Sequence, residues 1–478
     1  MNNSDSRSGG TGRHAVLRGQ WGKLCAGSSP AFGTTIGGKM FNNSRQLLIT
    51  LAVVVTSLIG QTPDQVLADG KNELNNGQYV RAESLFTQAL EMDPTFSPAM
   101  LELARINLRL GKMKETRDFL KGAIDADPEN QEFRDEFDRI NEINTLMNDA
   151  GRYMGDADYT NAFESYRIVL EKFPIYAEAA YSMGVAKFRG KNLDEAVQHF
   201  KISLKINPYH EKARTELDNV TKKTFNDGMR AYKRGDLDGA LNAYNRVLVF
   251  DQNFYHAHFQ LGVIDAKMGN RDLAIDHYQI ALDINPNFYK GWYAMGISKK
   301  AKSDNEGALA AFKTAVEVNP AYDKAYGAMG TIYLSEKKYD EAIEVLNTAV
   351  QVNSKYSKGY STLGVVYSEM EDWANAANNL VFATTYNEKD ATAWYRLAAA
   401  YNKLDECDLA EQAARKSTDR KPAFGGGWIE LGVATWCEGK GNKVASVNAL
   451  EKARKDRTWR KIAEYEMDKI VNPQKYQN

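Results

Sequence analysis

The chain lacks the features that mark several common classes of protein. It contains only three cysteines among 478 residues, Cys25, Cys407 and Cys437, and none lies in a CxxC pair or another metal-ligand spacing. A disulfide framework and a cysteine-based metal site are therefore both excluded. The formal net charge is only −1. Since no bulk positive field exists to neutralise phosphates, we expect no nucleic-acid partner.

Long hydrophobic runs are nearly absent as well. The single sustained one, LLITLAVVVTSLIG at residues 47–60, is shorter than the roughly 20 residues that a membrane-spanning helix needs. Arg45 precedes it and polar residues from Gln61 follow it, which is the layout of a secretory signal. We predict a signal peptide at 40–60 and a periplasmic or secreted protein. The alternative is an uncleaved inner-membrane signal anchor, which would then be the only membrane contact.

Residues 1–39 do not belong to that pattern. They are rich in glycine and serine, show no periodicity, and resemble the conceptual translation of a transfer-RNA gene. We expect the native protein to start at Met40, with 1–39 either not part of it or disordered. Peptides from 1–39 in N-terminal mass spectrometry of native protein would contradict this expectation.

Motifs of catalysis are missing too. HExxH, GxSxG, a Walker loop and a Rossmann glycine pattern do not occur. His256 and His258 stand two residues apart, so on a helix they point to different faces and do not form a divalent metal site. The sequence therefore predicts no catalytic residue, no metal, no cofactor and no enzyme.

A small residue recurs in the second half of the chain at an interval of 34. The series is Gly228, Gly262, Gly296, Gly330, Gly364, Ala398 and Gly432. A second series keeps the same interval: Ala240, Ala274, Ala308, Ala342, Ala376 and Ala410. A period of 34 held over seven units indicates tandem repetition of one supersecondary unit.

The other residues of the unit keep helical spacing. A bulky residue often stands four before the glycine, an aromatic or large aliphatic residue follows it by sixteen, and proline often ends the unit. Small residues would let two antiparallel helices approach, and the aromatic would fill the wedge between successive units. Gly235 and Gly269 fall at the turn between the two helices, where positive φ is useful.

This pattern resembles the tetratricopeptide repeat, W-x2-L-G-x2-Y followed by A-x3-F-x2-A and P. The resemblance implies an all-α fold, a right-handed α-solenoid superhelix of about eleven antiparallel helix pairs with a C-terminal capping helix. The predicted segments are repeats at 63–130, a helical insert at 131–142, repeats at 143–210, a second insert at 211–220, repeats at 221–457, and a capping helix with a tail at 458–478.

Two features interrupt the regular array. Each insert is interpreted as a long or kinked helix, which either adjusts the packing or acts as a hinge between blocks. Cys407 and Cys437 lie near adjacent repeat ends, and we interpret them as a free buried pair; a close approach of the two thiols is the alternative.

In the family, the first helices of the repeats line an inner groove for partner segments. Mapped onto this chain, the second repeat position supplies Lys290, Lys324 and Lys358. The other mapped groove residues are Phe259, Tyr293, Tyr395, Arg396 and Trp436. We predict a basic and aromatic groove that suits an acidic or aromatic partner segment. The alternative is that the lysines are merely solvated and the aromatics pack between repeats.

The resemblance therefore implies an exported scaffold that binds protein partners of unknown identity. A glycan-associated module of the cell envelope or polysaccharide export apparatus, with Tyr293 and Tyr395 stacking on sugars, is the alternative. A cytoplasmic co-chaperone adaptor is disfavoured, because the asparagine that the family's chaperone-tail clamp needs after the repeat glycine is replaced by residues such as Val263 and Ile297.

Overall fold

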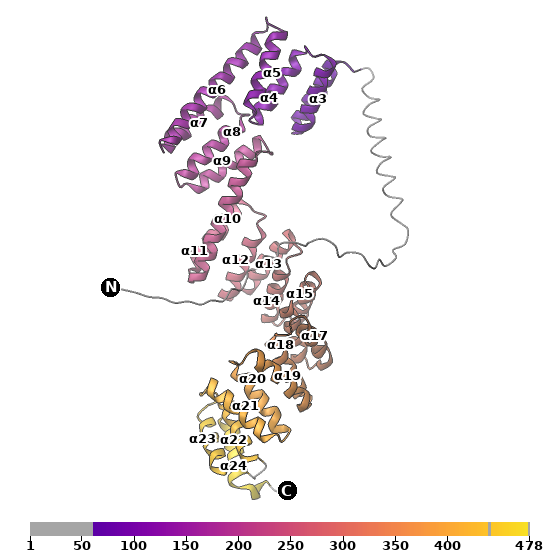
Figure 1. Cartoon of the computed structure of the whole chain (residues 1–478), viewed down its shortest axis with the longest axis vertical. Coiled ribbons are helices and arrows are strands. Elements are labelled where there is room, and N and C mark those ends of the chain that lie inside the picture. Colours follow the sequence, from indigo (N-terminus) through magenta and orange to yellow (C-terminus); the bar gives the residue numbers. More distant parts are fainter. Residues whose placement is uncertain (1–60, 438–440, 477–478) are drawn as a thin grey trace, which may run out of the picture. The chain divides into compact units, whose positions relative to one another are not determined.

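A computed structural model describes residues 61–437 and 441–476. The predicted leader (1–39) and signal peptide (40–60) lie outside the described residues. Those residues form helices and no strand, and the chain divides into two compact units, Met1–Glu142 and Ile143–Asn478. Within each unit the helices follow one another as antiparallel pairs (Figure 1).

The described part of the first unit contains two complete pairs and the start of a longer helix. These helices are α2 (Pro63–Asn75), α3 (Tyr79–Met92), α4 (Ser97–Arg109), α5 (Met113–Ala126) and α6 (Gln131–Gly155), the last of which continues into the second unit. The predicted insert 131–142 is the first part of α6, which has 25 residues.

The second unit holds the remaining helices. They are α7 (Tyr159–Lys172), α8 (Ala177–Arg189), α9 (Leu193–Ile206), α10 (Glu211–Arg234), α11 (Leu237–Phe250), α12 (Tyr255–Met268), α13 (Arg271–Ile284), α14 (Tyr289–Ala301), α15 (Asn305–Val318), α16 (Asp323–Ser335), α17 (Tyr339–Val352), α18 (Ser357–Glu369), α19 (Trp373–Tyr386), α20 (Ala391–Lys403), α21 (Cys407–Arg420), α22 (Gly425–Trp436), α23 (Lys443–Ala453), α24 (Arg460–Val471) and the short η2 (Pro473–Lys475). The predicted all-α solenoid of eleven helix pairs with a capping helix, α24, is confirmed.

The repeat glycine makes room for a large side chain of the second helix. A Cβ atom placed on Gly296 would lie 2.5 Å from Cε1 of Phe312, and one on Gly262 would lie 2.6 Å from Cε1 of Tyr278. Phe312 is fully buried and shares a core cluster with Met329 of the following repeat. The period of 34 therefore records one close contact, glycine against ring, that is repeated in successive helix pairs.

The turn between the two helices of a pair uses the left-handed backbone region. Gly235 and Gly269 have φ of 83° and 91°, as predicted. The same repeat position also has positive φ where it is not glycine, as in Ser303, Glu371 and Asp405. The packing of the pair therefore imposes this conformation, and glycine only makes it easier to adopt.

In four repeats the bulky residue near the start of the first helix closes the preceding turn. The indole Nε1 of Trp292 donates to the carbonyl of Pro286 at 2.9 Å, and Trp394 and Trp428 make the same bond six residues back. His258 occupies the equivalent position, with Nε2 3.1 Å from the carbonyl oxygen of Gln252. This contact gives His258 a structural role.

The prediction of free thiols at Cys407 and Cys437 is wrong, because the two residues form a disulfide. Their Cα atoms are 5.7 Å apart, within the usual range. Cys407 is the first residue of α21 and Cys437 directly follows the end of α22. Since consecutive helices are antiparallel, the start of α21 and the end of α22 meet at the same end of the helix layer.

Candidate functional site

Aromatic pairs fill the junctions between most of the later repeats. Phe259 meets Phe288 edge to face, with ring centroids 4.9 Å apart, and Tyr395 meets Phe424 in the same way at 5.3 Å. Tyr293 packs against Tyr322 with centroids 5.2 Å apart. We call this series of pairs, at the fifth and thirty-fourth repeat positions, the aromatic ladder.

Four of the predicted groove residues are thus engaged in packing. Phe259, Tyr293 and Tyr395 are half-buried members of the ladder, and burial raises the pKa of Tyr395 to about 12. Trp436 packs against the terminal core cluster that contains Ile429 and Leu450. Their faces and edges are mainly in contact with neighbouring repeats rather than with solvent.

The ladder lacks both rings in the repeat that begins at α18, and it lacks one ring in the preceding repeat, where Gly327 takes the fifth position beside Tyr356. Ser361 stands at the fifth position and Asp390 at the thirty-fourth, so the two rings found at other junctions are missing. A pocket of about 560 Å³ lies there. It is lined by Tyr356, Ser357, Lys358, Ser361, Thr362, Asn387, Asp390, Thr392 and Arg396. The structure therefore brings two predicted groove residues, Lys358 and Arg396, together in one hollow.

The side chains around the pocket are polar, and its acid is already engaged. The Asp390 carboxylate caps α20 by accepting from the backbone N–H groups of Thr392 and Ala393 at 2.9 and 3.1 Å. Arg396 Nη1 lies 3.4 Å from the hydroxyl of Ser361, which is its only hydrogen bond to a described residue. Two cations and several hydroxyl groups are therefore directed at a space that can hold an anionic or polar group.

The predicted lysines continue this positive character along α14, α16 and α18. Lys290, Lys324 and Lys358 are exposed, and none forms an ion pair with an acid in the described part of the chain. Lys300, which the sequence pattern did not single out, donates to Thr331 Oγ1 at 2.8 Å. Burial and, to a lesser extent, the charge of Lys358 lower the pKa of Lys300. The two ammonium groups therefore lie close enough to repel one another.

We call these residues the cationic surface: Lys290, Lys300, Lys324, Lys358 and Arg396. Lys300 occupies position twelve of the repeat, which lies on the same helical face as positions two and five. This spacing could have identified Lys300 from the sequence.

A half-buried glutamate lies at the C-terminal end of the array. Glu430 on α22 accepts a hydrogen bond from Asn402 Nδ2 at 2.8 Å and faces Glu466 on α24. Burial, reinforced by the charge of Glu466, raises the pKa of Glu430 to about 7, although the Asn402 hydrogen bond acts in the opposite direction. No sequence motif pointed to this residue.

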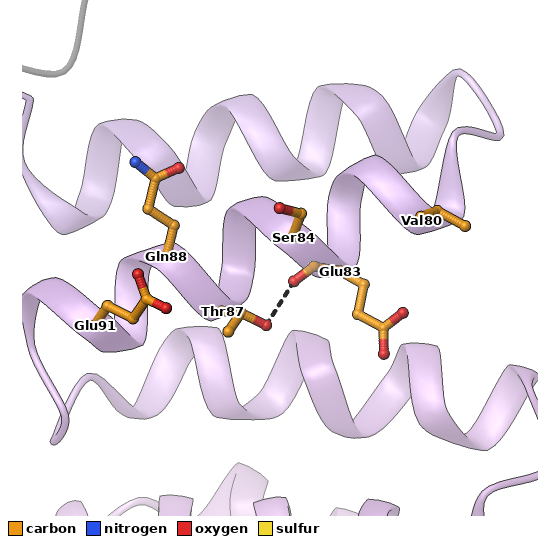
Figure 2. Close-up of a pocket in the computed structure, with 6 residues that line it drawn as sticks. All are labelled: Val80, Glu83, Ser84, Thr87, Gln88 and Glu91. Atoms are coloured by element: carbon orange, nitrogen blue, oxygen red, sulfur yellow. Dashed lines mark hydrogen bonds between the residues drawn. The ribbon is translucent and has the colours of Figure 1, made fainter. Parts of the chain in front are cut away.

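A second hollow, in the first unit, is less promising. It measures about 460 Å³, and Figure 2 shows that its lining residues, among them Val80 and Glu91, follow one helix, α3. The Thr87 hydroxyl donates to the Glu83 carbonyl of the same helix at 2.8 Å. No second element contributes a group, so the side chains do not converge on a ligand.

Within residues 61–437 and 441–476, no three His, Cys, Asp or Glu side chains gather in a way that could hold a metal ion. In the same stretch, no helix combines the length and apolarity needed to cross a bilayer.

Several repeat families match the sequence. Families described as tetratricopeptide repeat match at 73–135, 152–211 and 255–288, one described as TPR repeat matches at 228–269, and the tetratricopeptide repeat protein 21 C-terminal ARM domain matches at 289–424. No curated protein sequence matches the chain significantly.

Solved structures of repeat proteins resemble the chain over various lengths. YrrB, a TPR protein with an unusual peptide-binding site, is 20% identical over 39% of this chain and 96% of its own, with a TM-score of 0.35. In the Cut9–Hcn1 hetero-tetramer of APC/C, the matched chain is 14% identical over 87% of this chain and 98% of its own, at 0.43. Yeast Tom70 is 13% identical over 86% and 96%, at 0.36.

The glycine period, the eleven helix pairs and the repeat families that match between residues 73 and 424 all agree. The chain belongs to the tetratricopeptide repeat family.

Proposed function

We propose that the protein is an exported, non-enzymatic scaffold that binds an acidic segment of a partner protein on the cationic surface. The observation that carries this proposal is the set of cations without a carboxylate partner, two of which, Lys358 and Arg396, line the pocket where the aromatic ladder is interrupted. A tetratricopeptide repeat array supports protein partners in general, and the charges select among them.

The pocket and the lysines would act differently in binding. An acidic side chain that enters the pocket would meet Lys358 and Arg396 where it loses water, and it would therefore contribute to the lifetime of the complex. Lys290 and Lys324 are exposed, so they would mainly accelerate association. Binding should weaken as the ionic strength rises, because exposed charges are screened.

The site is tested by reversing charge. Lys290→Glu, Lys324→Glu and Lys358→Glu combined should abolish crosslinking of partner proteins in the native cell. The matched control is the same reversal at Lys313, Lys443 and Lys461, which are exposed lysines of α15, α23 and α24. Unchanged partner capture by the first variant would reject the cationic surface as the binding site.

Export is supported by two independent features. One is the apolar segment 47–60 behind Arg45. The other is the disulfide between Cys407 and Cys437, since such bonds persist in oxidising compartments. Native protein should therefore begin close to Gln61, and both thiols should resist alkylation until a reductant is added. Free thiols in native protein would contradict export.

The alternative groove function, sugar stacking by Tyr293 and Tyr395, has less support. Both rings contact aromatic neighbours edge to face, and burial raises the pKa of each phenol. A ring held in this way offers little free surface to a sugar.

A further inference from the structure

Helix α19 differs in composition from every other helix of the described residues. Its sequence, WANAANNLVFATTY, contains no Asp, Glu, Lys, Arg or His, whereas each of the others carries at least one of them. A surface helix without charge is unusual, because charged side chains normally cover the solvent face. A ligand of such a face would meet no charged side chain on α19 and would itself be neutral.

Neutral polar and aromatic side chains form the exposed stripe of this helix. Asn375, Asn378, Phe382, Thr385 and Tyr386 are exposed and follow the spacing of one helical face. The exposed fractions of Phe382 and Tyr386 are 47% and 39%. At 1.5 Å per residue the stripe is about 16 Å long, enough for roughly three pyranose units in a row.

Tyr360 of α18 joins the two rings of α19. Its ring centroid is 5.1 Å from that of Phe382, with 29° between the planes, and 5.8 Å from that of Tyr386 at 30°. The rings of Phe382 and Tyr386 are nearly parallel, at 14°. In the ladder the rings meet edge to face and are half-buried, but here the exposed rings of Phe382 and Tyr386 and the half-buried ring of Tyr360 have similar orientations.

Hydrogen-bonding groups beside these rings remain available. The amide of Asn378 and the hydroxyl groups of Tyr360 and Tyr386 make no hydrogen bond to any residue that the structure describes. Neither does a cation lie over any of the three rings within that part of the chain. The surface thus combines exposed aromatic planes with unpaired amide and phenol groups.

The neighbouring repeats carry different residues at the same positions. In α21 the equivalents of Phe382 and Tyr386 are Lys416 and Arg420, which both pair with Glu388. In α17 they are Thr348 and Val352. The aromatic face is therefore a property of one repeat and not a requirement of the fold.

We propose that the exposed face of α19, together with Tyr360, binds a neutral carbohydrate chain. The aromatic planes would cover the C–H faces of pyranose rings, and the amide and phenol groups would exchange hydrogen bonds with sugar hydroxyls. Charged side chains are absent because a neutral ligand could not compensate for their loss of water. No residue of this face belongs to the cationic surface, so the inference does not depend on the proposed partner binding.

The test measures oligosaccharide binding by calorimetry with the full chain. The probes are cellohexaose, chitohexaose and maltohexaose, with a hexauronate as the acidic comparison. At least one neutral probe should bind, and the variant Phe382→Ala with Tyr386→Ala should bind it at least tenfold more weakly. The matched control, Thr348→Ala with Val352→Ala in α17, should bind as the unchanged protein does, and so should the triple lysine reversal.

The variant Phe382→Leu with Tyr386→Leu keeps apolar volume but removes the rings, so it controls for loss of folding. It should lose as much binding as the alanine variant. The inference is overturned if no neutral probe binds, or if the ring variants bind as tightly as the unchanged protein. It is also overturned if only the hexauronate binds, or if the ring variants abolish self-association instead, which would make this face a contact between copies.

Discussion

Two repeats of the same chain show which parts of the unit can vary. In the repeat of α14 and α15, Gly296 faces Phe312, and the junction is filled by Tyr293 and Tyr322. In the repeat of α18 and α19, Gly364 faces Leu380 equally closely, with a Cβ on the glycine 2.5 Å from Leu380 Cγ. The junction of this second repeat, however, holds small polar residues and a pocket.

This difference distinguishes two structural roles within the repeat. The glycine contact holds the two helices of a pair together, and it is kept in both repeats. The junction residues join one pair to the next and can be replaced without loss of the pair. Ligand sites can therefore evolve at junctions and on outer faces, and the pocket and the aromatic face both occur in the repeat of α18 and α19.

The end of the array adds contacts that the period does not contain. The disulfide, the half-buried Glu430 and the ring of Trp459 all belong to the last repeats and the segment that follows them. The ring of Trp459 meets those of Tyr395 and Phe424. A terminal repeat has no successor to cover it, so other contacts must stabilise it.

Removing the disulfide should have the largest effect and should be confined to this end. Cys407→Ser with Cys437→Ser opens a link across 30 residues and should destabilise the last repeats by about 3–4 kcal/mol. Hydrogen exchange should accelerate in α21–α23 but not in α14 and α15. Equal acceleration in both regions would show that the array unfolds as one unit.

The titration of Glu430 should make the same end sensitive to pH. Its pKa is about 7 when folded against an ordinary 4.5, so protonation favours the folded state. This stabilisation is complete below pH 4.5 and is lost as the pH rises through 7. Glu430→Gln should remove this pH dependence of the unfolding free energy. Between pH 4 and 8 the stability of the variant should therefore rise by about 3 kcal/mol relative to that of the original protein. Denaturant titrations at several pH values measure it, and parallel curves would contradict the assignment.

The glycine contact of a regular repeat should be sensitive to one methyl group. Gly296→Ala places Cβ against the ring of Phe312 and should cost about 2 kcal/mol. Gly151→Ala is the control, since no atom lies within 4 Å of its added Cβ in α6, and it should stabilise by about 0.5–1 kcal/mol. Urea unfolding measures both. The same sign for the two substitutions would refute the packing role of the repeat glycine.

The tryptophan bond to the preceding turn should contribute less. Trp292→Phe keeps a ring but loses the donor to the Pro286 carbonyl, at a cost of about 1 kcal/mol. His258→Trp places the preferred donor at an equivalent position and should leave stability unchanged or raise it. Thermal unfolding distinguishes these outcomes, and a loss of stability from His258→Trp would show that the imidazole has another role.

Filling the interrupted junction should change stability less than the substitutions above, but it should weaken binding of the acidic partner segment. Ser361→Tyr restores the residue type found at Tyr293 and Tyr395 and should alter the unfolding free energy by no more than about 1 kcal/mol. It should occupy the pocket and weaken capture of an acidic partner segment. Normal capture by a folded Ser361→Tyr protein would remove the pocket from the binding site.

Much of the fold could be predicted from spacing, because the contacts involved are local. The glycine at position eight meets a residue sixteen further on, across one turn, and the turn itself recurs at the same place in each repeat. The groove residues followed from the family, and the structure brings Lys358 and Arg396 together while it places Tyr293 and Tyr395 in packing contacts.

What the sequence by itself determined is the repeating pair of helices, its period, its turn and its number of copies, because the contact that defines the unit joins residues only sixteen positions apart across one turn. Only the tertiary structure decided that Cys407 meets Cys437, that Lys300 lies near Lys358, and that Tyr360 lies beside Phe382 and Tyr386. These contacts depend on which helix ends and faces meet, both within a pair and between stacked pairs, and a pattern along one chain does not contain that geometry.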